Sequence, residues 1–241
     1  MGEPTVRAVL RTPQFWWRVA IVFACALGLM SGERRLAYFT TQSNVIVVAY
    51  FAVAVFWMLR RRRTDAPAPV LRGGVTLWIV ITGLVSHVLL NQGASPFPGM
   101  ADPDAAVALA NQSLFILHYA VPAMVLLDWV LFPPHGMVRW RDAGWWMLYP
   151  VAYGAITLVR AAVFPTVSDR FPYPFLDYVD LGAGVVVSLL RVVAVMAVLA
   201  VGVVALDKLA AAFTRRRVDE RRYDADERPR DADEAPDAVS V

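Results

Sequence analysis

Polar side chains cluster at the start of one long apolar run. Residues 40–44 carry three hydroxyl groups and two amides, and the apolar run 45–59 follows directly. Polar side chains that enter a bilayer are costly unless they have a partner or a role there. A threonine hydroxyl becomes a nucleophile when a base, most often histidine, lies within hydrogen-bond reach. Thr40 and Thr41 are therefore candidate nucleophiles, unless these hydroxyls only bond backbone carbonyls of membrane helices.

Two histidines lie in later apolar runs and are the candidate bases. They are His87 and His118, whereas His135 falls in a polar segment. Two histidines are fewer than the three protein ligands of a catalytic zinc, and the single cysteine, Cys25, supports neither a disulfide nor a thiolate site. We therefore predict no metal and no cofactor. A haem held by His87 and His118 is the alternative, and interhelical hydrogen bonding is another.

Two arginines also lie within apolar runs. Placing a guanidinium inside a bilayer costs on the order of 3 kcal/mol, so Arg160 and Arg191 need a function or a partner. Together they suit the carboxylate or phosphate of an anionic ligand. Arg160 has the alternative of reaching the membrane interface, and Asp177 and Asp180 are candidate partners for Arg191.

The elements that position these groups are six apolar runs. The chain of 241 residues is 58% hydrophobic, with a mean hydropathy of +0.51, whereas soluble domains are roughly 45–50% apolar. Each run is long enough for a helix across about 30 Å of hydrocarbon, and a barrel would show short alternating segments instead. We predict an all-α, multi-pass membrane protein with spans at residues 15–30, 41–59, 75–90, 114–132, 145–164 and 181–206.

The charged residues predict how these spans are oriented. Arginines occupy the leader 1–14, the segment 60–72, the segment 133–142 and the tail 207–241. Basic residues favour the cytoplasmic side, so both termini should be cytoplasmic, with the Arg34–Arg35 pair as the exception. A cleaved signal peptide is the alternative for the first run. The tail is mixed in charge without apolar periodicity, which predicts disorder.

The use of arginine, alanine and valine also predicts where the protein is located and what it binds. Lys208 is the only lysine, and this use of arginine with abundant alanine and valine is typical of a GC-rich bacterium. We therefore predict a bacterial plasma membrane protein whose partner is membrane lipid. Topology explains the arginines, so nucleic-acid binding is not predicted. With this orientation, five helices bring polar stripes to the outer half of the bilayer, where they would line a cavity that opens to the outer leaflet.

Three short stretches carry a family resemblance. They are Phe39–Asn44, the segment His118–Pro122 followed by Asp128, and Tyr173–Asp177. Their order resembles the androgen-induced protein and androgen-dependent TFPI-regulating protein family, together with the six-helix bacterial membrane proteins related to it. Eukaryotic members of that family are described as membrane threonine hydrolases that cleave fatty acid esters of hydroxy fatty acids.

The resemblance implies a mechanism for this chain. Thr41 would be the nucleophile, and His118 would take its proton while the hydroxyl attacks a lipid ester. Independently of the resemblance, the polar residues at this depth lead us to expect that Asn44 or Tyr173 holds the oxyanion and that Arg160, Arg191 or His87 binds the substrate. Another lipid ester is an equal candidate as substrate. A non-catalytic lipid-binding or transport protein is the alternative function, and a structural or partner-binding membrane protein is a further one.

Overall fold

The chain forms a bundle of helices that are long and apolar enough to cross a membrane. The computed structural model describes residues 5–32, 36–97 and 99–226, which contain helices and loops but no strand. Six of these helices could span a bilayer by length and composition. The predicted fold class, an all-α multi-pass membrane protein, is confirmed. Arg34 and Arg35, the first four residues and the chain from residue 227 lie outside the described residues.

The helices follow the predicted order with longer bounds. The first four spans are α2 (Pro13–Ser31), α3 (Phe39–Arg61), α4 with its extension η1 (Pro69–Leu84 and Val85–Leu90), and the joined segments α5, η2 and α6 (Ala105–Phe115, Ile116–Ala120 and Val121–Leu131). The last two are α7 (Asp142–Val163) and α9 (Gly184–Asp226). Short helices complete the fold: α1 (Val6–Leu10), η3 (Pro174–Leu176) and α8 (Tyr178–Leu181).

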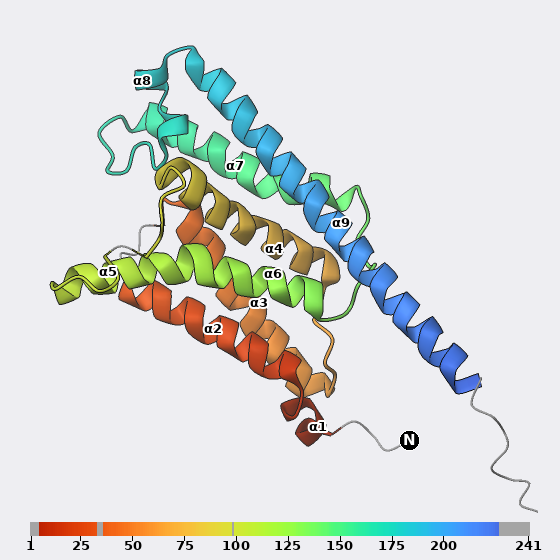
Figure 1. Ribbon diagram of the computed structural model, residues 1–241. Coiled ribbons are helices and arrows are strands. Elements are labelled where there is room, and N and C mark those ends of the chain that lie inside the picture. The colour runs from red at the N-terminus through yellow and green to blue at the C-terminus, as the bar shows by residue number, and fades with distance from the viewer. Residues whose placement is uncertain (1–4, 33–35, 98, 227–241) are drawn as a thin grey trace, which may run out of the picture.

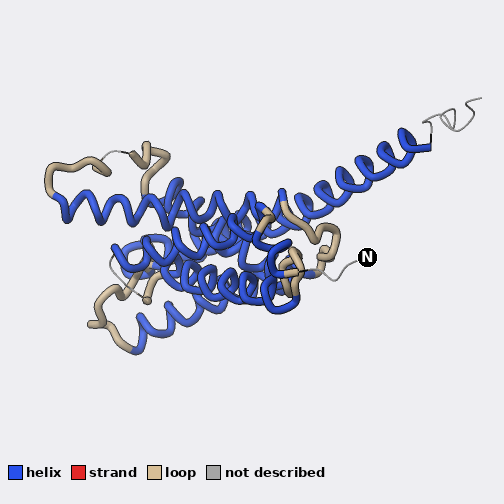
Figure 2. Tube along the Cα trace, turned by 90° about the horizontal axis from the view of Figure 1, so that it is seen from below, coloured by secondary structure: helices blue, strands red, loops and turns tan. Residues whose placement is uncertain are grey.

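The largest departure from the predicted bounds is at the end of the chain. The sequence predicts disorder after residue 206, but α9 continues to Asp226. Residues 207–226 contain no glycine or proline and are rich in Ala, Arg and Asp, so nothing in this segment breaks the helix. At 1.5 Å per residue the extension is about 30 Å long. Both views show it projecting beyond the bundle (Figure 1, Figure 2).

Helix α4 is the centre of the bundle. It contacts α3, α6, α7 and α9, while α2 packs against α3 and α6 (Figure 1). Small residues make the close contacts: a Cβ added at Gly73 would lie 2.3 Å from the Trp146 ring of α7. One apolar core joins α4 to α7 and α9, and a second joins it to α2, α3 and α6. Helix α4 therefore lies between the two apolar cores and contributes side chains to both.

Charged side chains are buried at one end of the bundle. This arginine-rich end comprises the start of α2 and the loops 62–68 and 132–141. Asp128 accepts hydrogen bonds from Arg18 Nε (3.0 Å) and from Arg72 Nε and Nη2 (3.0 and 2.7 Å), and all three residues are at most 1% exposed. Arg18 Nη1 also donates to Thr64 O at 2.7 Å. This cluster ties α2, α4 and α6 together. We call the opposite end, with loops 92–104 and 164–183, the far end.

Candidate functional site

Both histidines of the membrane helices lie in π-helical turns. His87 is in η1, where Asn91 N donates to Ser86 O at 2.8 Å, and His118 is in η2. Turns of this type are rare and frequently occur at functional sites. Pro122 gives the physical reason for η2, because proline has no N–H to donate to the carbonyl of His118 four residues earlier. The proline was the sequence signal for this distortion, and our sequence reasoning missed it.

The two π turns are neighbours. A Cβ added at Gly83 of α4 would lie 3.0 Å from the carbonyl oxygen of His118, so the two backbones approach closely there. Asn91 Nδ2 donates to the Tyr119 hydroxyl at 2.8 Å, and that hydroxyl lies 3.4 Å from His87 Nδ1. A glycine and an interhelical polar network therefore hold the two histidine-bearing turns against each other.

The histidine groove lies between these turns. It is an open groove of about 500 Å³ between α4 and α6, and His87, His118, Tyr119 and Pro122 help to line it. His118 is 8% exposed, and its Nδ1 lies 2.9 Å from Leu114 O. A carbonyl oxygen can only accept, so Nδ1 carries the proton and the neutral ring has its lone pair on Nε2. His118 thus has the tautomer that a general base needs.

The hydroxyl cluster of α3 divides between two faces of the helix. Thr40, Ser43 and Asn44 are buried, whereas Thr41 is only half-buried and lies one turn before Val45, which is 45% exposed. Thr41 therefore belongs to the outward side of α3. No hydrogen bond joins Thr41 to His118 in the described structure, and Thr41 does not line the groove that His118 lines. Their catalytic pairing stays a prediction.

Asn44 makes structural contacts between helices. Its Nδ2 donates to Thr40 O within α3 (2.9 Å) and to Leu117 O of η2 (3.3 Å). The Cys25 thiol of α2 lies 3.3 Å from its Oδ1. The amide therefore joins three helices, and both hydrogens of the amide group already have partners. That arrangement leaves little donor capacity for the predicted oxyanion role.

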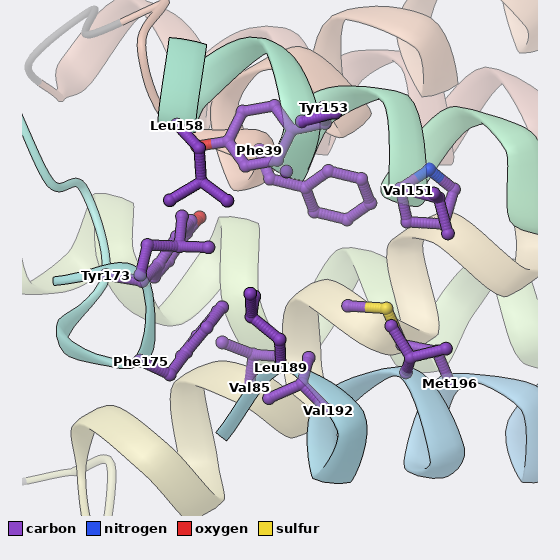
Figure 3. A pocket seen from close by; sticks show the side chains of 15 residues that line it. Phe39, Val85, Val151, Tyr153, Leu158, Tyr173, Phe175, Leu189, Val192 and Met196 are labelled. Atoms are coloured by element: carbon purple, nitrogen blue, oxygen red, sulfur yellow. The ribbon is translucent and has the colours of Figure 1, made fainter. Parts of the chain in front are cut away.

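A second hollow, the α7–α9 cavity, lies on the other side of α4. Its volume is about 240 Å³, and apolar side chains from α7, α9 and η3 surround it (Figure 3). Two tyrosines at its wall already have partners: Tyr153 donates to Ala37 O at 2.7 Å, and the Tyr173 hydroxyl accepts from Thr40 N at 3.2 Å. Burial raises the pKa of the Tyr173 phenol, which therefore stays neutral. The cavity suits an apolar chain.

The two predicted substrate arginines have different surroundings. Arg160 donates to the backbone carbonyl of Asp169 in the far-end loop, so it has a structural partner. Arg191 is exposed and has no hydrogen bond or ion pair with any described residue, so neither predicted pairing, with Asp177 or with Asp180, is formed. The Asp177 carboxylate instead caps α8. Arg191 lines a smaller hollow of about 140 Å³ between α4 and α9. Val85, Val192 and Met196 line both this hollow and the α7–α9 cavity.

These positions bring together two groups of predicted residues. His87 and His118 share one groove, and Arg191 lies beside the cavity that Tyr173 lines. Over the described residues, no three His, Cys, Asp or Glu side chains gather where they could hold a metal ion. No protein family matches this chain, and neither the curated proteins nor the solved structures contain a significant match.

Proposed function

We propose that this multi-pass membrane protein binds a membrane lipid, with the lipid's apolar chain in the α7–α9 cavity. The observation that carries the proposal is the cavity itself, which is apolar and has its only hydroxyl groups engaged in hydrogen bonds. Apolar pockets with a few oriented polar groups are the usual form of small-molecule sites.

Access from the bilayer is consistent with this use of the cavity. Val151 of α7 and Val193 of α9 line it and are 47% and 39% exposed on the lipid-facing surface of the bundle. A lipid chain could therefore enter laterally between these two helices without crossing water. Arg191 gives a reason for an anionic head group, because an unpaired guanidinium in a bilayer favours an anion.

A lipid-ester hydrolase is the second candidate, and the geometry of His118 favours it. Its Nδ1–H is directed to Leu114 O, which leaves Nε2 ready to accept a proton. The nucleophile would be Thr41, as the family resemblance implies, and α3 would have to bring that hydroxyl toward His118. The relation to the androgen-induced protein family remains a proposal that rests on the three sequence motifs.

Two glycines of α7 provide a matched test of lipid binding. Gly154 lines the cavity and Gly144 does not, and a Cβ added at either would meet no atom within 4 Å. We expect Gly154→Leu to fill the cavity and to abolish crosslinking of a phospholipid with a photoreactive acyl chain, measured in nanodiscs. Gly144→Leu should crosslink as the wild type does. Equal crosslinking in both variants would contradict the proposal.

Activity measurements separate the two candidates. The purified protein is incubated with a fatty acid ester of a hydroxy fatty acid, and the released acids are measured by mass spectrometry. The hydrolase requires activity that is lost in Thr41→Ala and in His118→Ala but retained in Gly144→Leu. Absence of turnover, together with cavity-dependent crosslinking, leaves lipid binding alone.

A further inference from the structure

We propose that the histidine groove is a separate binding site for the hydroxyl group of an uncharged lipid, such as a long-chain alcohol, with His118 Nε2 as the hydrogen-bond acceptor. This groove lies between α4 and α6, whereas the α7–α9 cavity lies on the other side of α4. The inference therefore does not depend on the lipid proposed for that cavity.

The acceptor follows from the fixed orientation of the His118 ring. Its Nδ1–H is directed to Leu114 O, and Nε2 has no hydrogen-bond partner among the described residues. The ring lines the groove, so a molecule in the groove can reach it. In the hydrocarbon region no bulk water is present to satisfy a free acceptor, and an unsatisfied polar group there costs free energy. A ligand that donates a hydrogen bond is therefore favoured.

The other polar groups of the groove show why this donor should be a hydroxyl. The Tyr119 oxygen accepts from Asn91 Nδ2 and lies 3.4 Å from His87 Nδ1, so both groups already have a partner. The groove thus offers an acceptor on His118 and a second imidazole ring, that of His87, in the same lining. A hydroxyl group can donate to His118 Nε2, and because it both donates and accepts, it is compatible with either tautomer of His87.

Charge argues against an ionic ligand in this groove. None of the residues that line it is Asp, Glu, Lys or Arg, and apart from the two histidines and Tyr119 the lining is apolar. An anion or an ammonium group would be desolvated there without an opposite charge, which is unfavourable. The hydroxyl of a long-chain lipid has no such cost, and its chain can lie along the apolar part of the groove.

A ligand pair that differs only in the hydroxyl hydrogen tests the proposal. Hexadecanol and hexadecyl methyl ether have the same chain, but the ether cannot donate. The full-length protein in nanodiscs of uncharged phospholipid is titrated with each ligand. We expect the alcohol to bind about three- to tenfold more tightly, as for one net hydrogen bond. His118→Phe should abolish this preference, and the cavity variant Gly154→Leu should retain it.

A spectroscopic measurement keeps the test independent of variant stability. In ¹⁵N-histidine-labelled wild-type protein, the Nε2 resonance of His118 should shift with the alcohol and not with the ether. Equal affinity for the two ligands, or an Nε2 resonance that does not respond to the alcohol, would overturn the assignment. A preference for the alcohol that persists in His118→Phe would overturn it as well.

Discussion

Replacing Asp128 with asparagine should strongly destabilise the bundle. The Asp128 carboxylate is fully buried and accepts hydrogen bonds from the guanidinium groups of Arg18 and Arg72. With the carboxylate the cluster has one net positive charge, and without it two unneutralised guanidinium groups remain buried side by side. Breaking a buried ion pair costs about 3–5 kcal/mol, so we expect a loss of at least about 3 kcal/mol in the free energy of unfolding.

The two arginines should differ in their effects. Arg72 donates to both the side chain and the backbone carbonyl of Asp128 and to Phe132 O, whereas Arg18 contacts the carboxylate through Nε alone. Arg18→Met would leave a neutral pair of Asp128 and Arg72, because the remaining charges cancel. We therefore expect Arg18→Met to cost less than Arg72→Met, and both to cost less than Asp128→Asn.

The assay is equilibrium unfolding in detergent micelles, followed by far-ultraviolet circular dichroism. Arg63→Gln is the matched control, because Arg63 forms an exposed ion pair with Asp65, with side chains 67% and 40% exposed. Exposed pairs contribute about 0–1 kcal/mol, so this control should unfold nearly as the wild type does. If Asp128→Asn unfolds no more readily than Arg63→Gln, then the buried cluster does not hold the three helices together.

Three further predictions concern packing and the loops at the two ends of the bundle. Gly73→Ala should lower the free energy of unfolding by about 1–3 kcal/mol, because the added methyl group would clash with the Trp146 indole. Gly144→Ala is the control and should not, because a Cβ at Gly144 would meet no atom within 4 Å. Equal thermal unfolding of the two variants would refute this reasoning. Burial lowers the pKa of His135 below that of the unfolded chain, so the folded state favours the neutral ring, and this contribution to stability is lost as the pH falls from about 6.5 through the lowered pKa. We therefore expect His135→Gln to reduce the fall in unfolding free energy below about pH 6.5. An unchanged pH profile in this variant would argue against the effect. Tyr173→Phe should cost about 1–3 kcal/mol in chemical unfolding, because it leaves a buried backbone N–H without its acceptor; a neutral effect would show that the hydroxyl contact contributes little.

The candidate site was partly visible in the sequence. His87 and His118 were singled out as polar groups in apolar runs, and they do share a groove. Their π-helical turns were not predicted, because apolar periodicity reports where a helix runs and not how its hydrogen bonds shift. Pro122 was the one local signal, since it frees the carbonyl of His118. The partners of Asp128 were beyond sequence reasoning, because Arg18 and Arg72 are 110 and 56 positions away along the chain.

The sequence by itself determined that the described part of the chain forms six helices long and apolar enough to span a membrane, because hydropathy and run length are properties of the local sequence. Only the tertiary structure decided which face of each helix is buried. In α3, Thr40 is buried in the bundle and Thr41 lies toward the outside. The apolar run 45–59 that follows places apolar residues on both of these faces of the helix. Lipid tails are as apolar as the interior of the bundle, so hydrophobicity gives no rotational preference, and packing by small residues and interhelical hydrogen bonds sets the rotation instead.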